Sequence, residues 1–87
     1  PNSLPAIYLL AMIAMEQADY KTAETRLETY LVKVPDAPQA LLNRAIVRLR
    51  LGDVDQAWAD VQRVLPDADW LPRIHFLAEE IHSLRGD

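Results

Sequence analysis

Apolar residues recur at intervals of three and four along most of the chain, which is the spacing of one face of an α-helix. In the segment 20–34, for example, Ala23, Leu27 and Leu31 follow this spacing. The segment 4–17 is instead apolar almost all round, as in a helix packed on several sides. The pattern predicts no β-strand and five helices, over residues 4–17, 20–34, 38–51, 54–65 and 71–85.

Residues that begin helices fall between these segments. Asp19 and Asp53 can each accept hydrogen bonds from the free N–H groups of the helix that follows. Asp36 and Asp53 are each followed three residues later by glutamine, which is the spacing of a capping box. Pro38 and Pro72 fall in first turns, where the missing N–H costs nothing. Because the connections are two to five residues long, neighbouring helices are expected to pair as antiparallel hairpins.

The chain also repeats itself at a step of 34 residues. A small residue followed by aspartate recurs at this step, at positions 18–19, 52–53 and 86–87. In the second pair, Gly52 can take a left-handed conformation and end the preceding helix. The same step aligns Ala11 with Ala45 and Ala23 with Ala57. A shared helical period would align apolar residues by chance, but it would not align a small residue and an aspartate three times. The sequence therefore predicts repeated two-helix units.

A helix–turn–helix unit of 34 residues, with small residues where its helices touch, resembles the tetratricopeptide repeat. The motif positions are Ala11, Ala23, Leu27 and Pro35 in the first unit, and Ala45, Gly52, Ala57 and Val61 in the second. The resemblance implies an all-α fold whose antiparallel helix hairpins stack as a right-handed α-solenoid of five helices. It divides a single domain, 1–87, into a first repeat at 2–35, a second at 36–69, and a half repeat or capping helix at 70–87.

Three positions depart from the repeat pattern. Arg44 and Arg48 stand where the first unit has apolar residues, and Asp69 replaces the closing proline of the second unit. Glu79 replaces the small contact residue in the fifth helix, where it would bury a charge unless solvent reached it. Glu79 therefore favours a terminal, solvated helix. The pair at 86–87 favours the start of another second helix, and both interpretations stay open.

Composition and charge narrow the classes of function. The 87 residues are 51% apolar and 25% charged, as in a folded domain. A net charge of −4 argues against nucleic acid and against an anionic membrane surface, and no apolar run reaches the roughly 18 residues of a spanning helix. The absence of cysteine excludes disulfides and thiolate metal sites. Because the chain begins with Pro1, we expect an excised part of a longer protein, whose targeting signals and compartment the sequence leaves open.

Candidate catalytic and metal-binding residues are few. His75, Glu79 and His82 share one face of the fifth helix and are residue types that bind zinc. Their spacing differs from the His-Glu-x-x-His motif and a fourth ligand is missing, so we expect surface histidines and no metal. The sequence also has no glycine-rich phosphate loop and no nucleophile elbow. We therefore expect no enzyme activity and no cofactor.

Arg44 and Arg48 lie four residues apart on one helix face and admit two interpretations. In the first, which we favour, their stems pack on the domain and their charged heads reach water or Asp55 and Asp60. In the second, the two guanidinium groups form an anion-binding site. The sequence also places Arg48 where it could stack on the ring of Trp58 as a cation–π pair.

The resemblance implies a binding surface, because the first helix of each repeat lines the concave side of the stack in this family. The residues expected there are Tyr8, Met12, Leu42, Asn43, Ile46, Arg50, Arg73 and Phe76. Tyr8, Leu42 and Phe76 are equivalent positions and would form an apolar row, with Met12 and Ile46 as a second row. Such a surface suits a helix or an extended segment with apolar anchors. Because the array is small, about half of these candidates are expected to belong to the core.

Some members of this family clamp the free carboxyl terminus of a chaperone with basic and asparagine residues on this face. Asn43 and Arg73 match that pattern, but Tyr8 and Met12 stand where a lysine and an asparagine would be. The clamp is incomplete, and we do not predict this ligand.

Two hypotheses about function follow. In the first, the domain docks a peptide or a segment of a partner protein on its concave, partly apolar surface. In the second, it is a self-association element of a larger scaffold or secretion-type protein. Tyr8, Met12 and the apolar first helix would then pack against another copy, or against repeats outside this chain.

Overall fold

The computed structural model describes residues 3–68 and 70–86, and within them the chain is all-α, as the apolar pattern predicts. The helices are α1 (Leu4–Glu16), α2 (Tyr20–Lys33), α3 (Pro38–Arg50), α4 (Val54–Val64) and α5 (Pro72–Arg85). Each begins and ends within one residue of its predicted bounds. Two residues used in the repeat pattern, Asp69 and Asp87, lie outside the described residues.

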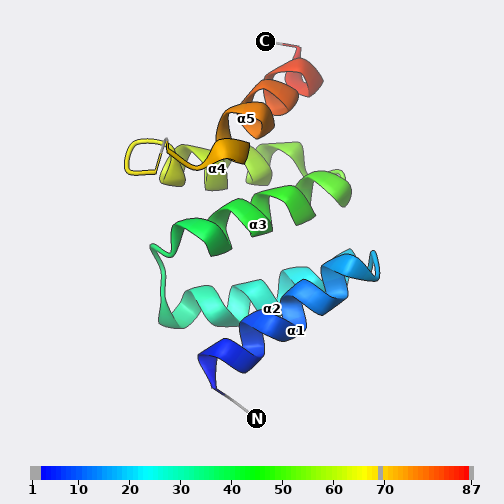
Figure 1. Ribbon diagram of the computed structural model, residues 1–87. Helices are drawn as coiled ribbons and strands as arrows, with labels where there is room; N and C mark the ends of the chain where they lie inside the picture. The colour runs from blue at the N-terminus through cyan, green and yellow to red at the C-terminus, as the bar shows by residue number, and fades with distance from the viewer. Residues whose placement is uncertain (1–2, 69, 87) are drawn as a thin grey trace.

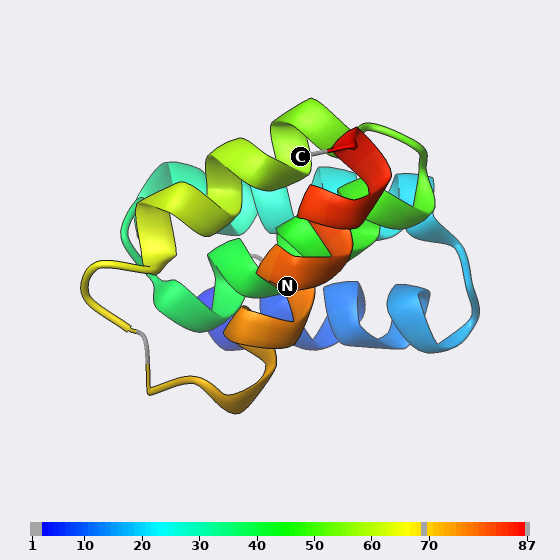
Figure 2. The ribbon, with the colours of Figure 1, turned by 90° about the horizontal axis from the view of Figure 1, so that it is seen from above.

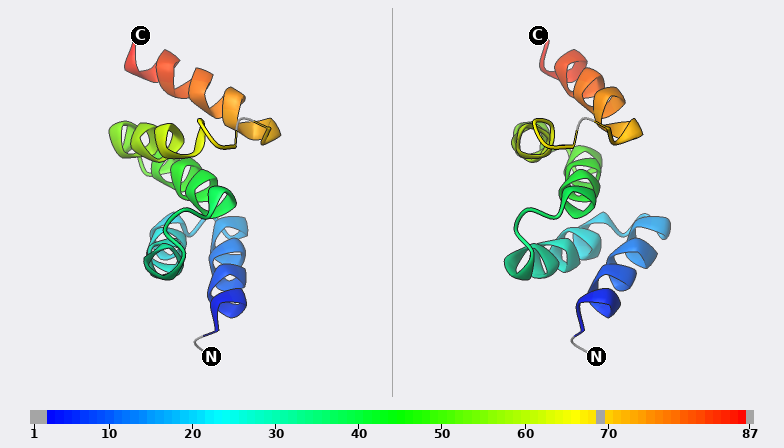
Figure 3. Two further views of the ribbon diagram at one scale, coloured as in Figure 1. Left: turned by 90° about the vertical axis from the view of Figure 1, so that its left-hand side faces the viewer. Right: turned by 60° about the vertical axis from the view of Figure 1, so that its left-hand side comes forward.

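The helices pair as hairpins that stack in one direction (Figure 1). α1 packs on α2 and α3 packs on α4, while α2 packs on α3 and so joins the two hairpins. α5 lies over this second hairpin and contacts both of its helices, as the view along the stack shows (Figure 2). The two ends of the chain lie at opposite ends of the stack (Figure 3). The resulting shape is elongated, with extents of 42 × 26 × 19 Å.

The same turn follows the first helix of each repeat unit, that is, α1, α3 and α5. Ala18, Gly52 and Gly86 all take the left-handed conformation, with φ of 59°, 87° and 79°. In each turn the N–H of this residue donates to the carbonyl three residues earlier, at 3.0, 3.1 and 3.2 Å. At Ala18 and Gly52 this conformation reverses the chain into a hairpin, and it explains why a small residue recurs at the step of 34.

The aspartates that follow two of these turns cap the next helix. The Asp19 carboxylate accepts a hydrogen bond from the Thr22 N–H at 3.4 Å, and Asp53 accepts one from the Gln56 N–H at 3.3 Å. The capping box predicted at Asp36 is wrong. Ala37 is the residue that precedes α3, and it provides no side-chain cap. Asp36 instead accepts a hydrogen bond from Arg63 at 3.0 Å.

Small residues lie where paired helices touch. Ala11 and Ala23 in the first hairpin, and Ala45 and Ala57 in the second, are all 0% exposed. Their short side chains let the two helix axes approach closely. The largest fully buried side chains surround these contacts and come from α2, α3, α4 and α5: Leu27, Leu42, Val47, Val61, Ile74 and Ile81.

Helix α5 is only half covered. Ile74, Leu77 and Ile81 face the core, but Leu84 is 59% exposed. Leu84 lies one turn beyond Ile81, where α5 contributes no further buried residue. Glu79 is exposed, so its charge stays in water as a carboxylate requires. The connection before α5 covers residues 65–71 and is longer than predicted.

Candidate functional site

The structure separates the eight predicted site residues into three groups. Ile46, Arg50, Arg73 and Phe76 line one groove between α3 and α5. Tyr8, Met12 and Asn43 form a contact between α1 and α3. Leu42 belongs to neither group, because it is buried in the core.

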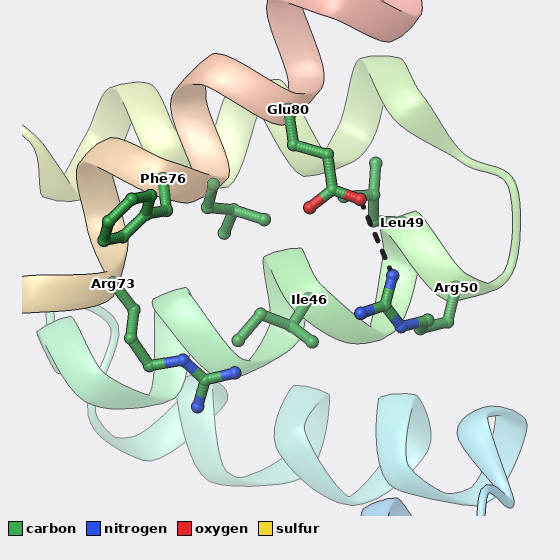
Figure 4. A pocket seen from close by; sticks show the side chains of 7 residues that line it. Ile46, Leu49, Arg50, Arg73, Phe76 and Glu80 are labelled. Carbon is green, nitrogen blue, oxygen red and sulfur yellow. Dashed lines mark ion pairs between the residues drawn. The ribbon is translucent and has the colours of Figure 1, made fainter.

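The α3–α5 groove has an apolar floor and a charged rim. Its lining residues are Ile46, Leu49, Arg50, Arg73, Phe76, Leu77 and Glu80. Ile46, Leu49 and Leu77 are each less than a tenth exposed, whereas Phe76 is 79% exposed. Figure 4 shows Phe76 and Arg73 at one end of the groove, Arg50 and Glu80 at the other, and Ile46 between them. The groove therefore offers an apolar slot with Arg73 at one end and the Arg50–Glu80 ion pair at the other.

The two arginines of the groove differ in their partners. Arg50 Nη1 lies 3.7 Å from Glu80 Oε2, and this ion pair crosses from α3 to α5. Arg73 has no carboxylate within ion-pair distance in the part of the chain that the structure describes. Arg73 is thus the cation at this site that remains available to an incoming anion.

The size of the groove limits what it can hold. It encloses about 160 Å³, and a cavity of about 150 Å³ accommodates a single benzene ring. Pockets for cofactors and drug-sized ligands are usually about 300–1,000 Å³. The groove is therefore of the size of one apolar side chain.

The Asn43 side chain joins α3 to α1. Its amide Nδ2 donates to the Tyr8 hydroxyl at 2.6 Å and lies 3.7 Å from Met12 Sδ. Burial raises the pKa of the Tyr8 phenol, and the hydrogen bond from Asn43 opposes that rise. Because Asn43 is 5% exposed and its amide is engaged inside the molecule, it is not available to a peptide terminus.

The burial of Leu42 contradicts the predicted apolar row of Tyr8, Leu42 and Phe76 across three helices. It is 1% exposed, while its equivalents Tyr8 and Phe76 are partly and largely exposed. The reason is position in the stack, because α3 has helices on both sides and α5 does not. Equivalent residues of successive units therefore do not share one surface.

A second apolar surface lies on the first hairpin. A shallow hollow of about 500 Å³ is lined by Leu4, Pro5, Tyr8, Leu9, Met12 and Tyr30. The rings of Tyr8 and Tyr30 pack with centroids 5.1 Å apart at 56°. None of the lining residues is charged, in contrast to the α3–α5 groove.

Arg44 and Arg48 form a buried charge cluster with Asp60. Arg44 donates two hydrogen bonds to Asp60, at 2.7 and 3.0 Å, and Arg48 donates one at 3.0 Å. These bonds to Asp60 raise the pKa of the Arg44 guanidinium. Arg48 also contacts the carboxylates of Glu24 at 3.2 Å and Glu28 at 3.5 Å.

This cluster decides between the two interpretations of the arginines. Carboxylates of the domain already occupy both guanidinium groups, so the anion-site interpretation is wrong. The favoured interpretation holds for Asp60, but Asp55 pairs instead with Arg85, at 3.9 Å. The spacing of Glu24 and Glu28, one helical turn apart on α2, was a signal in the sequence for the two further carboxylates that contact Arg48.

The fifth helix carries the histidines considered as metal ligands. Among the described residues, no three side chains of His, Asp or Glu are grouped closely enough to hold a metal ion. The His82 ring packs edge-on against Trp58, with centroids 4.6 Å apart. The cation over Trp58 is Arg85, at 5.9 Å. Arg48, which the sequence would have allowed to stack there, is held instead by Asp60 and Glu24.

Comparison with known proteins agrees with the stacked hairpins. The family model described as "Tetratricopeptide repeat" matches residues 8–70. No curated protein matched the sequence. Of the helices that the structure describes, none is both long enough and apolar enough to cross a membrane.

Proposed function

Since the chain belongs to the tetratricopeptide repeat family, whose repeats generally mediate protein–protein interaction, we propose that it docks a segment of another protein in the α3–α5 groove. This proposal rests mainly on the solvent exposure of the Phe76 side chain. Its ring is 79% exposed beside the buried floor residues Ile46 and Leu77. Burying such a ring stabilises a complex by about 1.5–3 kcal/mol, which the domain alone leaves unused.

The chemistry of the groove indicates what the segment carries. An aliphatic or aromatic side chain fills the slot of about 160 Å³ and packs on Phe76. A carboxylate next to that side chain pairs with Arg73, whose guanidinium can donate two parallel hydrogen bonds. The partner is therefore a segment in which an apolar residue lies beside an acidic one.

We also propose that this domain acts by binding and not by catalysis. The titratable groups that line the groove are two arginines and Glu80, and Glu80 is paired with Arg50 at 3.7 Å. Neither a nucleophile nor a general base stands free there, and the slot is too small to enclose a typical substrate.

Selection from a random peptide display library on the immobilised domain tests the docking proposal. We expect the enriched peptides to share an apolar residue next to aspartate or glutamate. In calorimetric titration, Phe76→Ala should weaken binding of a selected peptide about tenfold or more, because the ring is the anchor surface. Arg73→Ala should remove the preference for the acidic neighbour.

Arg26→Ala is the matched control, because Arg26 is exposed on α2, away from the groove. It should leave affinity unchanged. Peptides that bind the wild-type domain and the Phe76→Ala variant equally would place the contact elsewhere and contradict the proposal.

The second hypothesis from the sequence, self-association, concerns a different surface. The hollow on the first hairpin and the α3–α5 groove have no lining residue in common. A variant of one surface therefore leaves the other intact, and the two functions can be tested separately.

A further inference from the structure

We propose that Glu80 limits the α3–α5 groove to one acidic residue of a bound segment. Of the described residues that line the groove, Glu80 is the one carboxylate, and it is paired with Arg50. It cancels the attraction of Arg50 for a partner anion, so that the acidic residue of the segment binds at the Arg73 end. The inference rests on the proposed function, because it concerns a segment bound in this groove. It assigns Glu80 as a residue that determines specificity.

The two ends of the slot differ in net charge. At one end Arg73 has no carboxylate partner among the described residues, while at the other Glu80 Oε2 lies 3.7 Å from Arg50 Nη1 (Figure 4). Without Glu80 the slot would have a cation at each end and would favour acidic residues on both sides of an apolar anchor. With Glu80 the far end is neutral as a whole, and its carboxylate repels a second acidic residue.

The Arg50–Glu80 pair is loose and open to an incoming segment. The two side chains are 50% and 48% exposed and make one contact at 3.7 Å. By comparison, Arg44 donates two hydrogen bonds to Asp60, and these side chains are 15% and 3% exposed. An exposed pair of the first kind contributes little to the stability of a fold. Its charges therefore act mainly on what binds beside them.

The length of the slot sets the spacing of residues in the segment. Arg73 and Glu80 are seven residues apart on α5, which is two helical turns or about 10 Å along the axis. An extended segment spans this length in about three residues. When its acidic residue is at Arg73, the residue three positions along the segment lies at the Arg50–Glu80 pair, and the apolar side chain enters the slot between them.

Synthetic peptides that differ at this one position test the inference. They have the form acetyl-Gly-Asp-Leu-Ser-X-Gly-amide, with X as Gln, Glu or Lys, and a second set has the reverse order because the groove does not fix chain direction. Peptides of this length form no stable helix and can bind extended. Nuclear magnetic resonance titration of the isotope-labelled domain gives each dissociation constant.

The wild-type domain should bind the Glu peptide no more tightly than the Gln peptide. Glu80→Gln frees Arg50, so this variant should bind the Glu peptide about fivefold more tightly than the Gln peptide. Arg50→Gln leaves Glu80 without its partner and should favour the Lys peptide by a similar factor. A residue that only supported the fold would change all affinities by one factor and leave their ratio unchanged.

Glu79→Gln is the matched control. It removes the same charge from the next residue of α5, which is exposed and does not line the groove. The ratio of the Glu and Gln affinities should stay at its wild-type value, which separates a local effect of Glu80 from the net charge of −4 on the chain. Circular dichroism melting of each variant confirms that it is folded.

The outcomes separate this inference from the docking proposal. Wild-type binding that is about fivefold tighter for the Glu peptide than for the Gln peptide would overturn the role of Glu80, and so would equal ratios in Glu80→Gln and Glu79→Gln. Either result leaves docking in the groove intact. If no peptide of either set bound the wild-type domain, the docking proposal would fail and the inference would fail with it.

Discussion

Ala18 is the one non-glycine residue that the described chain holds in the left-handed conformation, with φ of 59°. Gly52 and Gly86 take the same conformation in equivalent turns. A residue with a Cβ is strained there by about 1–2 kcal/mol, because the Cβ approaches the following carbonyl oxygen. The hairpin connection thus imposes this conformation on Ala18 despite its cost.

Ala18→Gly should raise the free energy of unfolding by about 0.5–1 kcal/mol, since relief of strain outweighs the added freedom of the unfolded chain. Urea denaturation followed by circular dichroism measures the change. Gly52→Ala is the reciprocal control and should destabilise by about 1 kcal/mol. A Cβ at Gly52 would meet no atom within 4 Å, so only backbone strain acts there. Equal stability of both variants to wild type would refute the account.

Asp60 is the buried anion on which two arginines converge. It is 2% exposed and receives three hydrogen bonds from Arg44 and Arg48. Asp60→Ala should destabilise the domain by about 3 kcal/mol or more, because Arg44 is left partly buried without a counter-charge. Asp55→Ala, which removes a 91% exposed side chain paired at 3.9 Å, should cost less than about 0.5 kcal/mol. Losses of similar size in the two variants would argue against a structural role for the cluster.

At the scale of a single helix, α4 shows how a short side chain lets two helices pack closely together. Ala57 is 0% exposed in the second hairpin, one turn from the fully buried Val61. Ala59 lies on the same helix but faces solvent. The two alanines have equal helix propensity, so they differ only in what each side chain meets.

Ala57→Leu should overpack the α3–α4 contact and lower the free energy of unfolding by about 1–3 kcal/mol. Ala59→Leu adds the same atoms in solvent and should change it by less than about 0.5 kcal/mol. Thermal melting and urea denaturation of the two variants provide the comparison. An unchanged midpoint for Ala57→Leu would mean that α3 and α4 do not pack as described.

At the scale of the whole molecule, stacking makes α3 the central helix. Nine of its 13 residues are buried, against three of 14 in α5 and three of 13 in α1. In an array of this kind each unit is stabilised by its neighbours alone, so the ends open more readily than the middle.

Native-state hydrogen exchange should therefore be slowest for the amides of α3 and fastest for those of α5 and α1. We expect protection to fall in steps from α3 outward, because opening an end helix breaks one stacking contact and opening α3 breaks several. Mass spectrometry of exchanged peptides measures this order. Equal protection across all five helices would indicate one cooperative unit with no difference between its ends and its centre.

The sequence predicted the helices closely but predicted only part of the candidate site. Leu42 and Phe76 have the same place in the repeat, and only the three-dimensional stack shows that one is in the core and the other in solvent. Asn43 has the residue type of a family ligand site, yet its amide bonds Tyr8 within the domain. Spacing along a helix identifies a face, and it does not identify what lies against that face.

The sequence by itself determined the five helices, their caps at Asp19 and Asp53, and the turns at the step of 34 residues. These features depend on interactions within a few residues, such as i to i+4 hydrogen bonds and the φ of one residue. The tertiary structure alone decided that Asp60 receives Arg44 and Arg48, and that Phe76 and Arg73 meet Ile46 in one groove. Those outcomes depend on which helices pack on both sides of α3, and local spacing does not encode that arrangement.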